Sequence, residues 1–77
     1  MPSPASNNAA FHKLTSEGLK TLAERLADAQ GSAIATSGTA HHSGNQKLAA
    51  ELSSMGTRLG ELLTSVEAFR AKHAALH

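Results

Sequence analysis

Large apolar residues recur along the second half of the chain at alternating steps of four and three residues. This spacing averages 3.5 residues, the repeat that keeps one stripe of an α-helix facing a partner helix in a left-handed coiled coil. No proline interrupts it, so residues 45–77 are predicted to form one long helix. The heptad a positions are Leu52, Leu59, Val66 and His73, and the d positions are Leu48, Met55, Leu62, Phe69 and Leu76.

Residues 10–30 are predicted to form a shorter helix. Its apolar residues follow a helical period through Leu14, Leu22 and Leu26, and Gly31 offers a C-cap. The following segment, 31–44, holds three of the six glycines among serines and threonines and predicts a long loop.

Two further features bound these helices. The stretch from Ser43 to Gln46 matches a capping box, with Asn45 as a competing N-cap for the second helix. Residues 1–9, which are rich in proline, serine and asparagine, predict a disordered arm.

The predicted fold is therefore all-α: a two-helix antiparallel hairpin with a long second helix and a coiled-coil-like seam. Within it, Leu48, Leu52, Leu59 and Leu62 are expected to pack on Leu19, Leu22 and Leu26. At about 1.5 Å per residue, a helix over 10–30 covers only two-thirds of a helix over 45–77. Val66, Phe69 and Leu76 would then be left bare, which is typical of an interaction site.

A strip of small residues lies beside the apolar seam of the second helix. It comprises Ala49, Ser53, Gly56, Gly60, Thr64, Ala68, Ala71 and Ala75. Small side chains let helix backbones approach closely, and Gly56 and Gly60 have the small-xxx-small spacing. The strip predicts a second packing surface; the alternative is a preference for alanine and serine at exposed positions.

Composition excludes several function classes. The 77 residues carry a net charge of +1, no cysteine and two aromatic residues, so disulfides, a basic nucleic-acid surface and a base-stacking platform are not expected. No apolar run reaches the roughly 20 residues of a membrane span. The first residues lack the pattern of a cleavable signal peptide. Localisation is therefore left open between the cytoplasm and export by a specialised secretion system.

Five histidines are the candidate metal ligands. His41 and His42 are adjacent, and His73 and His77 are one helical turn apart. A zinc site needs three or four ligands, whereas each pair supplies two. For the second pair, the alternative to metal binding is a favourable interaction of the histidines with the helix C-terminus. The acidic residues show no paired arrangement, so neither an enzyme nor a cofactor is expected.

The layout resembles the needle subunits of type III secretion systems. The resemblance rests on the stretch "GNQKLAAELSSMGTRL", which is similar to the start of the second helix in those subunits. The resemblance implies export without a cleaved signal and helical polymerisation around a channel. There are three alternatives. The first is a Trp-x-Gly-type hairpin substrate of type VII secretion, although this chain has no tryptophan. The others are a secretion adaptor or chaperone that binds a partner helix, and a small phage or particle subunit.

The sequence thus predicts a non-enzymatic assembly subunit, with a second copy or a dedicated helical protein as its partner. The expected interface residues are Leu52, Met55, Gly56, Leu59, Gly60, Leu62, Val66, Phe69 and Leu76.

Overall fold

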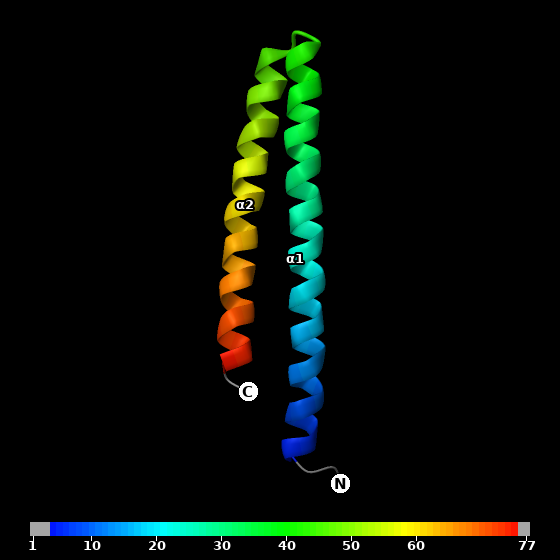
Figure 1. Ribbon diagram of the computed structural model, residues 1–77, viewed down its shortest axis with the longest axis vertical. Helices are drawn as coiled ribbons and strands as arrows, with labels where there is room; N and C mark the ends of the chain where they lie inside the picture. The colour runs from blue at the N-terminus through cyan, green and yellow to red at the C-terminus, as the bar shows by residue number, and fades with distance from the viewer. Residues whose placement is uncertain (1–3, 76–77) are drawn as a thin grey trace.

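Two helices pack side by side in opposite directions. The computed structural model describes residues 4–75, with side chains from residue 9 onward. Helix α1 runs over Pro4–His42 and helix α2 over Gln46–Ala75. The first turn of α1 and the last turn of α2 lie at the same end of the hairpin, where α1 extends beyond α2 (Figure 1). The predicted all-α, two-helix antiparallel hairpin is confirmed.

Helix α1 is much longer than predicted. It has 39 residues and α2 has 30, so the first helix is the longer one. The prediction of a loop over 31–44 is wrong for residues 31–42, because the chain stays helical past Gly31 and Gly38. Packing explains the difference: Ala33, Ser37 and Ala40 in this stretch are half-buried or buried, and burial against a second helix outweighs weak intrinsic propensity.

The predicted disordered arm also differs from the structure. Helix α1 begins at Pro4, so residues 4–9 are helical, and residues 1–3 lie outside the described part of the chain. Proline suits the first turn of a helix because the amide hydrogen that it lacks has no partner within the helix there.

The turn between the helices is built from three residues. Gly44 has a φ of +87°, and its N–H donates to His41 O at 3.1 Å. The N–H of Asn45 donates to Ala40 O at 2.9 Å, which completes a Schellman C-cap. The Asn45 Oδ1 then accepts from the N–H of Leu48 at 3.2 Å, so Asn45 is the N-cap of α2.

The seam between the helices, called here the hairpin seam, repeats every seven residues on both partners. Its half-buried and buried members on α1 are His12, Leu19, Ala23, Leu26, Gln30, Ala33, Ser37 and Ala40. On α2 they are Ala49, Leu52, Gly56, Leu59, Gly60, Leu63, Val66, Arg70 and His73. Among hydrophobic residues with described side chains, those classed as buried are Ala23, Ala40, Ala49 and Val66, at 4–7% exposure.

Small side chains bring the two backbones close together. A Cβ on Gly56 would lie 3.2 Å from Ile34 Cγ1, and a Cβ on Gly60 would lie 2.5 Å from Gln30 Nε2. The hydroxyl of Ser37 donates across the seam to the backbone oxygen of Ala49 at 2.7 Å. Part of the small-residue strip therefore packs against α1 of the same chain, not against a second copy.

The seam corrects the predicted internal packing. Leu52 and Leu59 are half-buried, but Leu48, Leu62 and Leu22 remain exposed. The reason is that α2 presents its a and e positions to α1, and the e positions are Ala49, Gly56, Leu63 and Arg70. In the half of α2 nearer the turn, the e residues are Ala49 and Gly56, which permit a closer approach of the helices than Leu48 and Met55 at d would.

The predicted bare end of α2 is likewise corrected. Val66 is only 7% exposed, because the longer α1 passes alongside it. Phe69 is exposed, although His73, four residues further along, still contacts α1. Exposed apolar surface therefore runs along the side of α2 and is not confined to its end.

Candidate interaction surface

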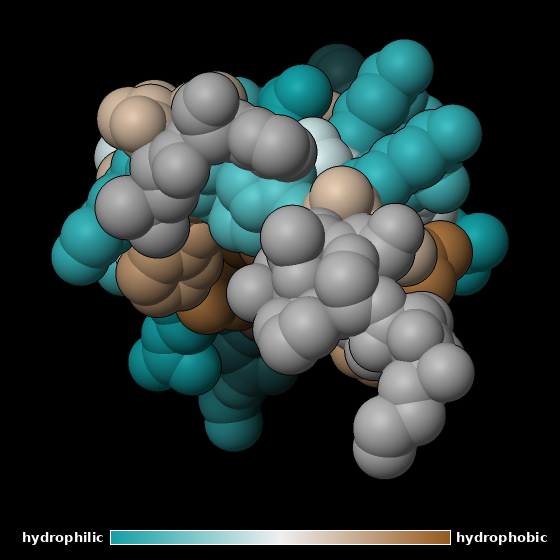
Figure 2. All heavy atoms as spheres, turned by 90° about the horizontal axis from the view of Figure 1, so that it is seen from below, coloured by the Kyte–Doolittle hydropathy of each residue, from teal (hydrophilic) through white to brown (hydrophobic). Residues whose placement is uncertain are grey.

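Four large apolar side chains at successive d positions are exposed along one side of α2. They are Leu48 at 42%, Met55 at 51%, Leu62 at 54% and Phe69 at 58% exposure. We call this row the apolar stripe. A seven-residue spacing keeps the four side chains on one face of a helix that supercoils about its partner. Apolar surface is visible at more than one place when the hairpin is seen from the end that holds both termini (Figure 2).

The stripe has an appreciable area. A fully exposed Leu, Met or Phe presents roughly 150–200 Å², so the four exposures together correspond to roughly 300–400 Å². The largest apolar patch on a typical monomer has a similar area and is often functional. An isolated exposed leucine would need no such explanation.

The nine predicted interface residues fall into three groups. Gly56 and Val66 are buried within the hairpin, and Leu52, Leu59 and Gly60 are half-buried in its seam. Leu76 lies outside the described residues. Met55, Leu62 and Phe69 are exposed and belong to the apolar stripe. The structure adds Leu48, whose place in the same heptad position was the signal, although we expected it inside the hairpin.

Helix α1 also exposes large apolar residues. Leu22 is 45% exposed, Ile34 57%, Leu14 63% and Phe11 66%. Ile34 lies beside Gly56, so it belongs to the edge of the seam away from the apolar stripe. The surplus of apolar surface is therefore not limited to one helix.

A row of mainly charged residues borders the apolar stripe. Glu51, Arg58, Ser65 and Lys72 each follow a stripe residue by three positions and are exposed. Residues three apart are neighbours on a helix surface. The ion pair between Glu67 and Arg70, with 3.1 Å between charged atoms, is set apart from this row and is solvent-exposed, so it contributes little to stability.

Two histidines meet where the last turn of α2 contacts α1. The rings of His12 and His73 stack with centroids 3.7 Å apart and planes 15° from parallel. Nε2 of His73 donates to the backbone oxygen of His12 at 3.0 Å. The pairing ties the C-terminal end of α2 to α1. The heptad pattern places His73 at an a position, but nothing in the sequence identifies this cross-helix partner.

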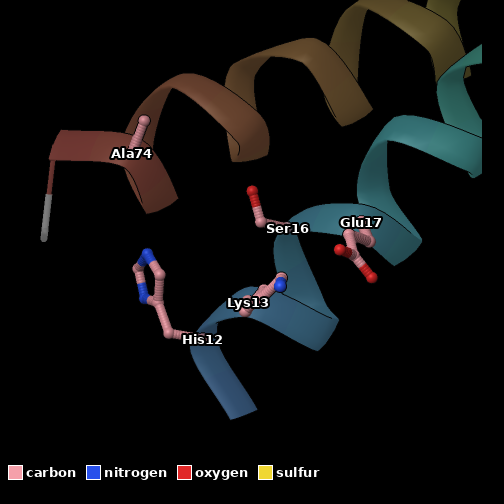
Figure 3. Close-up of a pocket in the computed structure, with 5 residues that line it drawn as sticks. All are labelled: His12, Lys13, Ser16, Glu17 and Ala74. Carbon is pink, nitrogen blue, oxygen red and sulfur yellow. The ribbon is translucent and has the colours of Figure 1, made fainter. Parts of the chain in front are cut away.

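A shallow hollow lies beside this histidine pair. Its lining residues are His12, Lys13, Ser16 and Glu17 of α1 and Ala74 of α2. His12 extends toward the last turn of α2, and Ala74 lies over the same space (Figure 3). The hollow is wide open to solvent and lies between only two helices, whereas ligand pockets enclose most of their ligand.

The remaining histidine pair caps the other end of the hairpin. The rings of His41 and His42 meet edge to face at 6.0 Å, and Nδ1 of His41 donates to Gln46 Oε1 at 2.8 Å. Across residues 4–75, no three His, Asp or Glu side chains come together as a metal site would require. His77, the predicted partner of His73, lies outside these residues. In the same part of the chain, neither helix is long and apolar enough to cross a membrane.

Comparisons with known proteins add no family. The chain matches no protein-family model, and no curated protein or solved structure matches it significantly. The hairpin and its exposed surface are therefore the structural features from which a function can be inferred.

Proposed function

We propose that this protein is a structural subunit without enzymatic activity that self-associates by helix–helix packing. The observation that carries the proposal is the contrast between the hairpin's interior and its surface. Its buried apolar residues are alanines and one valine, whereas eight larger apolar side chains are 42–66% exposed among the described residues. Burying such surface is the main driving force for association.

The overall dimensions support the same conclusion. The chain exposes 5700 Å² of surface, and a compact monomer of 7.9 kDa would expose about 4400 Å². Its radius of gyration is 18.0 Å, against about 11 Å for a compact domain of this length. A two-helix chain with so little buried surface gains stability when further helices pack on it.

A filament or a secretion needle is one form that such self-association would take. The resemblance to needle subunits favours it, although the continuous α1 and the three-residue turn depart from the layout on which that resemblance rests. The alternative, a secretion adaptor or chaperone, would use the same exposed surface to hold the helix of a different protein. Self-association and partner binding predict different sizes for the purified chain.

Sedimentation velocity of the purified full chain tests the proposal, with Phe69→Asp as the disrupting variant. The parent is expected to sediment as a dimer or larger, and a filament subunit would reach very large sizes. Phe69→Asp places a charge in the apolar stripe and is expected to yield a smaller species with unchanged helical circular dichroism.

The matched control is Ala68→Asp, because Ala68 is exposed, adjacent in sequence and outside the stripe. It should sediment like the parent. A parent that remains a monomer of 7.9 kDa at all concentrations would contradict self-association and leave the adaptor alternative.

A further inference from the structure

We propose that the apolar stripe of one copy packs against the same stripe of a second copy, with the two α2 helices antiparallel about a two-fold axis at Leu62. This inference depends on the proposed self-association and specifies its contact surface and register. The two hairpins would together form a four-helix bundle.

The available area fits a second copy of the chain. A stable interface buries about 800 Å² on each partner, of which somewhat more than half is apolar. The stripe supplies roughly 300–400 Å² of apolar surface from residues spaced evenly between Leu48 and Phe69 of α2. The remaining polar surface comes from the bordering row. A short peptide would cover only part of a stripe that follows most of a 30-residue helix.

A two-fold contact also matches the form of the surface. In such a contact the same patch serves both partners, so it must be complementary to itself. Leucine, methionine and phenylalanine at steps of seven can interleave with an antiparallel copy of themselves, as in helix-bundle cores. The structure exposes this row along one element, without a charged residue at any of its four positions.

The bordering charges select the register. With the axis midway between Met55 and Leu62, Arg58 would face Arg58 of the second copy, and like charges repel. With the axis at Leu62, Glu51 faces Lys72 of the second copy, and Arg58 faces Ser65. An axis at Met55 would also pair opposite charges, Glu51 with Arg58, but it overlaps much less of α2. The Leu62 register therefore combines opposite charges with a long overlap.

Single-cysteine variants test this register directly, because the chain has no cysteine of its own. A disulfide forms only where the two Cα atoms come within about 7 Å. Leu62→Cys, which places both thiols at the axis, is expected to give a disulfide-linked dimer under mild oxidation. Leu48→Cys lies on the same stripe but far from its own copy in this register, so it should remain largely uncrosslinked.

Two controls complete the experiment. Ser54→Cys is an exposed position of α2 outside the stripe and reports random collision. Charge reversal is independent of oxidation: Glu51→Lys and Lys72→Glu should each raise the dissociation constant at least about twofold, and the double variant should restore it.

The outcomes separate this inference from the proposed function. Selective crosslinking at Leu62→Cys together with rescue by the double reversal supports the register. Equal crosslinking at Leu48→Cys and Leu62→Cys, or none at Leu62→Cys in a parent that sediments as an oligomer, overturns the register while self-association stands. A monomeric parent overturns both.

Discussion

At the scale of single residues, glycines that look alike in the sequence have three different surroundings. Gly44 has a positive φ in the turn, Gly56 and Gly60 face α1 closely, and Gly31 has open space where a side chain would be. The sequence predicted close approach for Gly56 and Gly60 but assigned it to a neighbouring chain. The predicted helix end at Gly31 is wrong because the sequence alone does not distinguish a glycine that ends a helix from a glycine that a helix tolerates in its interior.

Alanine at Gly31 and at Gly44 should have opposite effects. Gly31→Ala is expected to stabilise the protein by about 0.5–1 kcal/mol, because alanine favours the helix and meets no atom within 4 Å. Gly44→Ala should destabilise it by about 1–2 kcal/mol, because a left-handed residue with a Cβ is strained. Urea unfolding at one protein concentration measures the free energy of unfolding of both variants. A stabilising effect of Gly44→Ala would contradict the positive φ of Gly44 in the turn.

The two seam glycines should also respond differently. Gly60→Ala requires only the flexible end of Gln30 to move, so the gain in helix propensity should leave it neutral or stabilising. Gly56→Leu overpacks a position where even a Cβ lies 3.2 Å from Ile34, and a loss of about 1–3 kcal/mol is expected. Equal unfolding free energies for Gly56→Leu and the parent would show that the helices are further apart than described.

At the scale of the elements, each helix could be predicted from the sequence only where large apolar side chains mark its period. Helix α2 was predicted almost to its bounds because large apolar residues mark its period. The C-terminal part of α1 was missed because Ala33, Ser37 and Ala40 pack the seam there, and such residues resemble a loop in the sequence. The sequence shows the heptad period but not which row of α2 faces α1, because the e row that faces it includes Ala49 and Gly56, which do not stand out in an apolar pattern.

The hydrogen bond across the seam gives a test of the extended α1. Ser37→Ala removes the donor to the Ala49 oxygen and is expected to cost about 1 kcal/mol. Thr36→Ala is the matched control, because the Thr36 hydroxyl bonds to Ser32 within its own helix and the residue is exposed. If residues 31–42 were a loop, the two variants would unfold at the same urea concentration.

At the scale of the whole molecule, the hairpin is 63 Å long and 12 Å thick in its thinnest direction. Every residue of so thin a body is close to solvent, and no described side chain is less than 2% exposed. The expectation that one copy exposes too much apolar surface followed from the sequence, but its cause did not. The predicted cause is a short first helix; in the structure the exposed apolar residues are the apolar stripe of α2 together with four large side chains of α1.

Thermal unfolding followed by circular dichroism over a hundredfold range of protein concentration is the decisive test of whether the folded state is an assembly of copies. If the folded state is an assembly of copies, mass action should raise the unfolding midpoint by roughly 5–10 °C across that range. A cooperative transition whose midpoint does not change with concentration would show that a single hairpin is stable alone, and would contradict self-association.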